Sequence, residues 1–433
     1  PIKSTYLIKQ ANFVACHNPS YINKYNMVQE LVDGGTFLLN CPWDMEGIEK
    51  HLPGQVKAFI ANHNIKFYVI DGIKIGKEIG LGGRINTVLQ SAFFKLAAII
   101  PEEEAIDLMK AAAKATYGRK GDKIVQMNYD AIDAGAKQVV EIAVPESWKD
   151  AADEGLTTPH VGEGGRADVV DFVKNIQAKV NAQEGNTLPV SAFNEYVDGS
   201  TPSGSSAYEK RGIAVDIPIW QPDNCIQCNR CAYVCPHAVI RPIALTEEEA
   251  ANAPEGMDMI DMMGMPNMKF SIAVSAYDCT GCGSCANVCP GKKGEKALVM
   301  KNMEENAGKQ DFFDYGREIP VKPEVVAKFK ETTVKGSQFK QPLLEFSGAC
   351  AGCGETPYAK LITQLFGDRM YIANATGCSS IWGNSSPSTP YTVNAKGQGP
   401  AWSNSLFEDN AEFGYGMLLA QNAIRDGLKA KVE

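Results

Sequence analysis

Two matching stretches of the chain decide its fold: CIQCNRCAYVCP at 225–236 and CTGCGSCANVCP at 279–290. Both follow the pattern Cys-x2-Cys-x2-Cys-x3-Cys-Pro, and the second begins 54 residues after the first. In this pattern three thiolates from one tight loop hold three corners of a 4Fe-4S cube, while the fourth cysteine reaches a second cube. The two stretches, named comb one and comb two here, therefore predict two clusters in one small ferredoxin-like domain.

The spacing predicts crossed ligation, in which each cluster takes three thiolates from one comb and one from the other. Set one then consists of Cys225, Cys228, Cys231 and Cys289, and set two of Cys279, Cys282, Cys285 and Cys235. A pair of structural zinc sites is the alternative, because zinc also binds Cys-x2-Cys pairs. The run of three cysteines at two-residue spacing in each comb favours iron and sulfur.

A third group of cysteines, named set three here, is incomplete. It consists of Cys350 and Cys353 in SGACAGCGE and Cys378 in NATGCSS. Three ligands leave a cube one short, so either a fourth cysteine lies elsewhere or the site does not hold a cluster. The spare cysteines, Cys16 and Cys41, have apolar surroundings that favour buried free thiols. We therefore expect the fourth ligand to lie outside this chain.

The composition indicates a multidomain enzyme in a reducing compartment. A chain of 433 residues has room for about two to four domains. With 44% apolar residues and no apolar run near the roughly 18 residues of a membrane span, we expect no membrane helix. The net charge of -9 argues against a nucleic-acid binder. Thirteen cysteines, mostly at metal-binding spacings and with no signal peptide before them, indicate a cytoplasmic location.

The N-terminal part of the chain alternates apolar runs with helical periodicity. The pattern predicts strands at 36–43 and 66–75 and helices over 85–99, 103–117 and 128–142. Such alternation is typical of an α/β layer with a largely parallel sheet. GLGGRIN at 80–86 follows a predicted strand and precedes a predicted helix, where backbone N–H groups could face a phosphate. Because it does not match GxGxxG, a plain tight turn is the alternative.

Composition also divides the chain into three predicted domains: 1–198, 199–342 and 343–433. The first starts at Pro1 as if in mid-domain, so we expect the chain to be a fragment. GSTPSGSSAY at 199–208 is a flexible connector by composition. The methionines of the insert at 255–268 are expected to pack locally rather than bind metal. The last domain shows one helix, over 410–430, and lacks the strands that a domain of its kind would need.

Longer motifs give the chain a family resemblance. ANFVACHNPSY, GLGGRINTVLQSAFF, the two combs, CAGCGETPY and the stretch from NATGCSSIWGN to FEDNAEFGYG resemble pyruvate:ferredoxin oxidoreductase, also called pyruvate synthase. The resemblance covers essentially the whole chain and makes it the middle portion of a longer polypeptide. It implies an enzyme that decarboxylates pyruvate with thiamine diphosphate, passes electrons through three 4Fe-4S clusters, and captures the two-carbon unit on coenzyme A.

The fold class that the resemblance implies is multidomain, with α/β and α+β parts. The domain at 1–198 would be a gamma-type oxidoreductase domain associated with coenzyme A and incomplete at its N-terminus. The ferredoxin-like domain with two clusters would follow, and then the start of a thiamine diphosphate-binding α/β domain. Set three would form the cluster nearest thiamine diphosphate, with its fourth cysteine far downstream, and the combs would carry electrons outward.

The resemblance also assigns roles to individual residues. Glu355 matches the family position that contacts thiamine diphosphate, although a salt bridge at a domain seam is an equal alternative. Cys378 matches a position that both ligates iron and lies beside that cofactor. Asn86 and Asn128 fall in stretches that resemble the coenzyme A region, and an amide can donate and accept hydrogen bonds to such a ligand. A helix cap or a satisfied turn is the alternative for both. No catalytic residue is assigned.

Several parts of the family pattern are missing from the chain. It has no glycine-aspartate-glycine motif for Mg2+ and the pyrophosphate of thiamine diphosphate, and no pyruvate-binding domain, so we expect no pyruvate turnover by the chain alone. The expected partners are ferredoxin or flavodoxin and the remaining portions of the enzyme, as a homodimer, without nucleic acid or membrane. A stand-alone iron-sulfur electron carrier and an oxidoreductase for another 2-oxoacid remain open. CAGCGET argues against the simple carrier.

Overall fold

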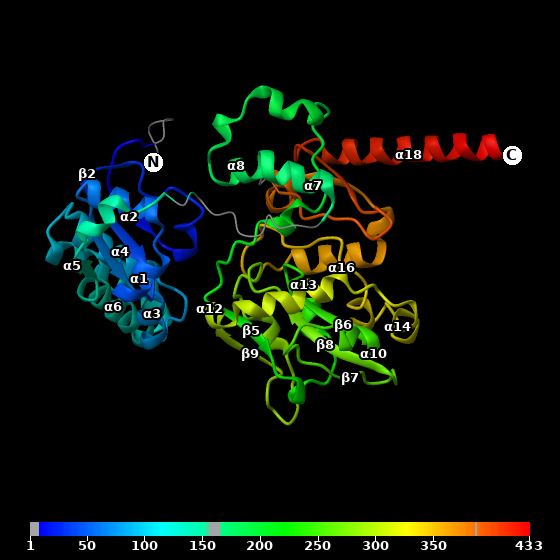
Figure 1. The fold of residues 1–433 in the computed structure, drawn as a ribbon, viewed down its shortest axis with the longest axis horizontal. Coiled ribbons are helices and arrows are strands. Elements are labelled where there is room, and N and C mark those ends of the chain that lie inside the picture. The colour runs from blue at the N-terminus through cyan, green and yellow to red at the C-terminus, as the bar shows by residue number, and fades with distance from the viewer. Residues whose placement is uncertain (1–7, 154, 156–164, 386–387) are drawn as a thin grey trace. The chain divides into compact units, whose positions relative to one another are not determined.

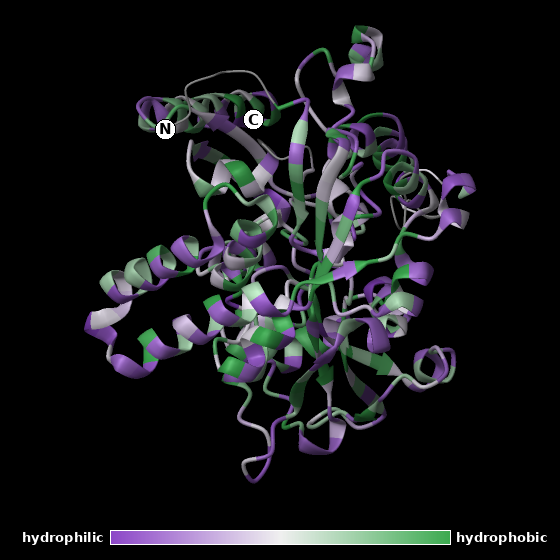
Figure 2. Cartoon of the chain, turned by 90° about the vertical axis from the view of Figure 1, so that its left-hand side faces the viewer, coloured by the Kyte–Doolittle hydropathy of each residue, from purple (hydrophilic) through white to green (hydrophobic). Residues whose placement is uncertain are grey.

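The computed structural model describes residues 8–153, 155, 165–385 and 388–433. The chain divides into two compact units, 1–158 and 159–433, and each unit is described by itself. Many strand segments are hydrophobic, whereas the helices alternate hydrophilic and hydrophobic residues (Figure 2). This pattern is that of helices packed with one face on a sheet core.

The first unit is built on one sheet with the strand order β1-β2-β3-β4 (Figure 1). Its strands are β1 Ala11–Cys16, β2 Leu31–Asn40, β3 Lys66–Ile70 and β4 Val140–Ile142. The first three run parallel, whereas β4 pairs antiparallel with β3. The predicted α/β layer with a largely parallel sheet is therefore confirmed.

The helices of the first unit agree in part with the sequence prediction. They are α1 Met45–His51, α2 Gly54–Asn62, α3 Gly72–Ile79, α4 Asn86–Ala97, α5 Glu102–Tyr117 and α6 Asp122–Lys137. The helices predicted over 85–99 and 103–117 are confirmed as α4 and α5. The third predicted helix begins earlier than expected, and the end of its predicted range forms β4 instead.

The strand predicted over 66–75 is wrong after Ile70. The side chain of Asp71 accepts a hydrogen bond from the backbone N–H of Lys74 at 2.9 Å and so caps the start of α3. The stretch GLGGRIN consequently follows a helix rather than a strand. Gly80 ends that helix with a φ of 91°, a left-handed conformation that glycine adopts without a steric penalty.

Successive residues of β2 point to opposite faces of the sheet, as strand geometry requires. Phe37 and Leu39 pack in a core that includes Trp148, whereas Leu38 packs in a second core with Val88 of α4. All five side chains are almost fully buried. Because both faces of the sheet are covered, its central strands are continuous apolar runs rather than alternating ones.

In the second unit, small antiparallel sheets hold the combs. The strand β5 Asp216–Trp220 pairs with β9 Leu298–Asn302, and β6 Ile240–Thr246 pairs with β8 Met268–Val274, which also pairs with β7 Ile260–Asp261. Each comb contains a short helix, α9 Arg230–Val234 in comb one and α11 Ser284–Val288 in comb two, and these two helices pack together. The repeat in the cysteines is therefore also a repeat in the backbone.

The second unit contains further helices and two further strands. The helices are α7 Ala167–Phe172, α8 Ala178–Asn181, α10 Glu247–Ala251, α12 Met303–Asn306, α13 Gln310–Glu318, α14 Pro323–Lys328, α15 Val334–Ser337, α16 Thr356–Phe366, α17 Cys378–Ser380 and α18 Asn410–Val432. The helix predicted over 410–430 is confirmed as α18. The strands β10 Tyr371–Ala375 and β11 Ala401–Ser405, which pair in parallel, were not predicted.

Three further expectations bear on the architecture. The methionine-rich insert packs locally as predicted at Met257 and Met262, which are buried in the core around the combs. The first compact unit ends well before the predicted boundary at 198, and the division into three domains stays a prediction. Among the residues that the structure describes, no helix has both the length and the apolar composition to cross a membrane.

Candidate iron-sulfur site

Each comb loop turns through two residues in the left-handed backbone conformation. These are Gln227 and Asn229 in comb one, with φ of 53° and 59°, and Gly281 and Gly283 in comb two, with φ of 67° and 74°. The turn points the backbone N–H of Gln227 at Cys225 Sγ, 3.4 Å away, and comb two repeats this contact from Gly281 to Cys279 at 3.4 Å. The loops thus present N–H groups to sulfur, as iron-sulfur clusters require.

Comb one reaches this geometry without glycine, and long-range hydrogen bonds hold it. The Gln227 side chain donates to the carbonyl of Asp261 at 2.7 Å and accepts from the backbone N–H of Met263 at 2.8 Å. The Asn229 amide donates to the carbonyl of Lys335 at 2.9 Å. A left-handed conformation is costly for residues other than glycine, so these bonds over-determine the loop.

The structure brings the thiols of set one together. Cys225, Cys228, Cys231 and Cys289 line one pocket, whose apolar wall includes Trp220, Ile272 and Leu298. Burial raises the pKa of Cys225, and the neighbouring Cys228 and Cys289 raise it further. Cys289 comes from comb two and also accepts a hydrogen bond from the backbone N–H of Ala297 at 3.3 Å. Three thiols of this pocket therefore come from comb one and the fourth comes from comb two.

Set two shows the reciprocal exchange. Burial raises the pKa of Cys279 to about 12, and Cys235 and Cys282 add to the shift. Burial also raises the pKa of Cys285, and Cys235 is the thiol that adds most to it. Cys235 belongs to comb one but lies against the thiols of comb two. The predicted crossing of the combs is thus the arrangement that the fold brings about, while the ligand roles stay a proposal.

The donor chemistry fits a group larger than a single ion. Within the described ranges, no group of three or more His, Cys, Asp or Glu side chains is close enough to hold one metal ion. Four thiols instead frame the apolar pocket of set one. Burial and neighbouring thiols raise the pKa of several of these thiols, which makes their ionisation unfavourable. A bound iron ion would offset this cost, because the metal charge deprotonates a coordinating thiol.

Set three lies next to comb two but is far less enclosed. Cys350 and Cys378 are exposed, and Cys353 is half-buried. The loop between the first two contacts comb two, since a Cβ on Gly352 would lie 3.6 Å from the Cβ of Cys282. The Cys353 thiol accepts a hydrogen bond from the backbone N–H of Glu355 at 3.4 Å, the same contact that each comb loop makes.

Glu355 lies at the start of α16 and faces aromatic side chains. Its carboxylate accepts a hydrogen bond from the indole N–H of Trp382 at 3.2 Å. Burial raises the pKa of Tyr391, and the nearby Glu355 charge raises it further. Trp382 follows Cys378 in the chain and packs with Cys353, so this side chain connects the two parts of set three. Among the described residues, the contact of Glu355 is with this indole rather than with a cation.

The two asparagines predicted near coenzyme A occupy different environments. Asn86 is exposed at the first residue of α4. Asn128 is buried in α6, where its side chain donates to the carbonyl of Ile124 at 2.8 Å within the same helix. The Asn128 donor is thus satisfied within its own helix rather than at a helix cap or a turn, and the coenzyme A role of both residues stays a prediction.

The two spare thiols lie in the first unit, in the same apolar core. Cys16 and Cys41 are buried, with 1% and 4% of their surface exposed. Burial raises the pKa of Cys16 to about 12. The predicted burial of both residues is confirmed by this packing.

Sequence reasoning missed a buried lysine beside the combs. Lys360 of α16 is 2% exposed, and its ammonium donates to the carbonyls of Ala232, Tyr233 and Cys235 at the end of α9. Burial lowers its pKa to about 8, although the nearby Cys235 acts in the opposite direction. The sequence signal for this residue is a lysine on the apolar face of an amphipathic helix. A prediction from hydrophobic periodicity does not interpret such a residue.

Comparison with known proteins assigns three regions of the chain. Residues 1–138 match the family described as pyruvate ferredoxin/flavodoxin oxidoreductase, residues 164–214 match a domain of unknown function, and residues 224–293 match a 4Fe-4S dicluster domain. The chain thus contains a region similar to this oxidoreductase family and a region similar to 4Fe-4S dicluster domains. The dicluster match contains both combs.

Curated relatives cover the whole chain. Pyruvate-flavodoxin oxidoreductase of Enterobacter agglomerans is 52% identical over 433 residues, which are 100% of this chain and 36% of that protein. Pyruvate:ferredoxin oxidoreductase of Moorella thermoacetica is 53% identical over 435 residues, again 100% of this chain and 36% of that protein. Pyruvate dehydrogenase [NADP(+)] of Cryptosporidium parvum is 47% identical, covering 100% of this chain and 23% of that protein. The chain thus spans little more than a third of the length of the first two relatives.

Proposed function

We propose that this chain is the electron-transfer portion of a 2-oxoacid:ferredoxin oxidoreductase. The complete enzyme would convert pyruvate, coenzyme A and oxidised ferredoxin into acetyl-coenzyme A, carbon dioxide and reduced ferredoxin. The observation that carries the proposal is that each comb places one thiol among those of the other, with Cys289 in the pocket of set one and Cys235 beside the thiols of comb two. The relatives, which are named for pyruvate and for ferredoxin or flavodoxin, support the choice of substrate and acceptor.

Each complete set of thiols would hold one 4Fe-4S cluster. Cys225, Cys228, Cys231 and Cys289 would ligate the first cluster, and Cys279, Cys282, Cys285 and Cys235 the second. A bound cluster would supply a one-electron acceptor. The chain's own contribution is the apolar wall that excludes water and the backbone N–H groups that face sulfur, since both tune a cluster's potential.

Set three would hold a third cluster together with a ligand from outside this chain. The contact of Gly352 with Cys282 supports an electron path from set three through set two, and the packed helices α9 and α11 support its continuation to set one. In the complete enzyme, thiamine diphosphate and Mg2+ would lie beside set three. Glu355 would contact that cofactor, and the indole of Trp382 would orient the carboxylate.

The remaining assignments rest on the relatives and on the first unit. Coenzyme A would bind the oxidoreductase domain near Asn86 and Asn128, and the exposed position of Asn86 is compatible with a ligand contact. The partners would be ferredoxin or flavodoxin and the remaining portions of the same enzyme, as a homodimer in the cytoplasm.

Iron and sulfide analysis tests the proposal. The 433-residue chain, reconstituted without oxygen, should bind about eight irons and eight sulfides in sets one and two, with visible iron-sulfur charge-transfer absorbance. On reduction with dithionite it should give the spectrum of two interacting clusters in electron paramagnetic resonance. Zinc in place of iron, without that absorbance, would end the proposal.

A further inference from the structure

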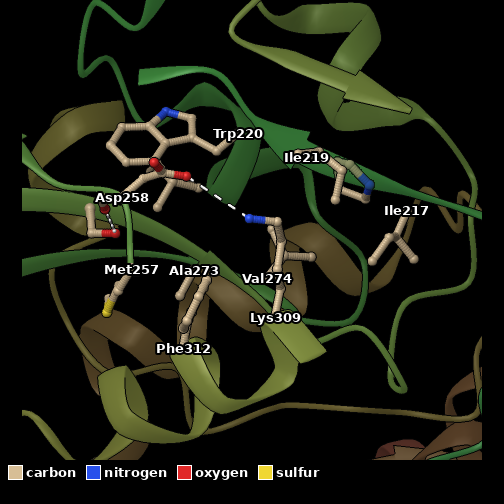
Figure 3. Close-up of a pocket in the computed structure, with 12 residues that line it drawn as sticks. Ile217, Ile219, Trp220, Met257, Asp258, Ala273, Val274, Lys309 and Phe312 are labelled. Atoms are coloured by element: carbon tan, nitrogen blue, oxygen red, sulfur yellow. Dashed lines mark hydrogen bonds and ion pairs between the residues drawn. The ribbon is translucent and has the colours of Figure 1, made fainter. Parts of the chain in front are cut away.

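The two combs repeat each other in their cysteines, whereas the strand residues that precede them differ. Trp220 lies five residues before Cys225, and Val274 lies five residues before Cys279, at the same 54-residue offset as the cysteines. Both residues end a strand, β5 and β8 respectively, and both line one pocket between these strands (Figure 3). At this position of the repeat, a tryptophan precedes comb one and a valine precedes comb two.

Trp220 forms the wall between that pocket and the pocket of set one. It lines the first together with Asp258 and Lys309, whose charges lie 3.9 Å apart, and the second together with the thiols of set one. Its ring is held in place by an edge-to-face contact with Phe270, with ring centres 6.1 Å apart. Only 6% of the residue is exposed. The indole therefore has little freedom to turn away from the cysteines.

The indole N–H of Trp220 is buried and, among the described residues, meets no acceptor in hydrogen-bond geometry. Trp220 and Cys225 line the same pocket, which brings the indole and the thiol together. Buried indole N–H groups usually have a hydrogen-bond partner. A cluster sulfur or thiolate carries negative charge and would be a far better acceptor than a neutral thiol.

We infer that Trp220 is a positioning residue that donates a hydrogen bond to the Cys225 sulfur of a bound cluster and raises the reduction potential of that cluster above that of its repeat partner. A hydrogen bond to cluster sulfur stabilises the reduced state, which carries one more negative charge, more than the oxidised state. Val274 has no donor, so the cluster of set two receives no such bond from the equivalent position. The inference rests on the proposed function, because it requires that both sets hold clusters.

The direction of the difference is the one that an electron path needs. Set three lies against comb two, so electrons that enter there reach set two first and set one second. A higher potential at set one makes the second transfer downhill. Trp220 thereby gives the two clusters of the repeat unequal potentials, and with them a preferred direction of electron flow.

The test compares Trp220→Phe with Val274→Leu in the full 433-residue chain, reconstituted without oxygen. Redox titration followed by electron paramagnetic resonance should show two waves. In Trp220→Phe, which keeps an aromatic wall but removes the N–H, the wave of set one should fall so that its reduction is about tenfold less favourable, or about 59 mV for one electron. The wave of set two should stay in place, and Val274→Leu should move neither wave. Full clusters with unchanged waves in Trp220→Phe overturn the inference.

A second measurement needs no substitution that could disturb folding. The unsubstituted chain, labelled with 15N in its indole rings, should show a nitrogen hyperfine coupling on the reduced cluster of set one. Absence of that coupling overturns the inference even where Trp220→Phe fails to assemble. Absence of clusters from the unsubstituted chain overturns the proposed function, and this inference with it, whereas normal clusters without the coupling overturn this inference alone.

Discussion

The combs and set three use the same ligand chemistry, but the fold encloses them to very different degrees. Four of the eight comb thiols are buried and the other four are half-buried, whereas two of the three thiols of set three are exposed. The combs lie beside paired strands, and their helices α9 and α11 pack together. Each comb also has one thiol of the other comb beside it. Set three has one such N–H contact, at Cys353.

The difference shows what makes a cysteine motif a metal site. Thiols at suitable spacings fix only the loop, and the fourth ligand comes from wherever the fold brings a second segment. In the combs that segment is the other comb, so the site is completed inside one small domain. In set three the spacing is present without the completing segment, and the thiols remain at the surface.

The prediction with the largest expected effect concerns the one cysteine that each comb contributes to the other comb's cluster. Cys235→Ser should abolish or disrupt the cluster of set two, because this residue completes the thiols of comb two, and Cys289→Ser should do the same to set one. Each variant should lose up to about four irons and four sulfides from about eight. Iron analysis and electron paramagnetic resonance of each variant give the measurement.

Cys41→Ser is the matched control, since this buried thiol lies in the first unit and should leave the iron content unchanged. The crossed arrangement is wrong if Cys235→Ser removes the cluster built on the other thiols of its own comb and spares set two.

The second test concerns the exposed thiols. In the reconstituted 433-residue chain, set three should bind iron substoichiometrically or not at all, and thiamine diphosphate should bind poorly. Iodoacetamide should therefore modify Cys350 and Cys378 within minutes, while clusters and burial protect the comb thiols. Mass spectrometry of peptides after timed alkylation follows this order. A full and stable third cluster in this chain would contradict the comparison, because set three would then be complete without further sequence.

Part of this comparison could be predicted from the sequence, because the comb spacing is local information. The parallel sheet and the helices α4 and α5 were predictable for the same reason, since periodicity reports which face of an element is buried. The prediction of a strand over 66–75 was wrong after Ile70, because Asp71 caps the start of α3 within an apolar run.

The side chains that support the combs could not be predicted from the sequence. Lys360 contacts Ala232 from 128 residues away in the chain, and Glu345 contacts Arg241 from 104 residues away. Such contacts arise only after the second unit has packed. The strands β10 and β11 carry polar residues at several positions, so their pattern does not distinguish them from loops.

The third test weakens the attachment of set three to the combs. Glu345 lies five residues before Cys350, is 2% exposed, and accepts hydrogen bonds from Arg241 and, at 2.8 Å, from Arg317. Burial raises the pKa of this carboxyl, but the two guanidinium groups outweigh burial, so the net shift is downward. Glu345→Gln would leave the partly buried Arg241 and the partly exposed Arg317 without this counter-charge, at a cost of up to about 3 kcal/mol in the free energy of unfolding of the second unit.

Urea denaturation of the second unit measures that cost. Glu331→Gln is the control, because this exposed carboxylate pairs with Lys340 at 2.8 Å and solvent screens the pair, so little change is expected. Equal effects of the two substitutions would show that Glu345 does not anchor the segment.

The smallest effect concerns a buried thiol that belongs to no set. Cys16 donates to the carbonyl of Asn18 at 3.1 Å, and burial raises its pKa from 9.0 to about 12. Because the folded value lies above the unfolded one, this thiol stabilises the fold below pH 9, and the contribution is lost as the pH rises from 9 to 12. Within that window the unfolded state binds fewer protons, so the free energy of unfolding falls by at most about 1.4 kcal/mol per pH unit.

Comparison with Cys16→Ala isolates this contribution, since lysines and tyrosines titrate over the same range in both proteins. Urea denaturation of the first unit at intervals between pH 8 and 11 should give a steeper loss of stability in the unsubstituted chain than in Cys16→Ala. Parallel slopes would mean that the Cys16 thiol ionises as readily in the fold as outside it. A steeper slope would show that the buried Cys16 thiol resists ionisation in the fold, with burial as the main cause and the neighbouring Cys41 as a smaller one. Burial raises the pKa of Cys279 and Cys285 in the same way, and there iron ligation would remove the penalty.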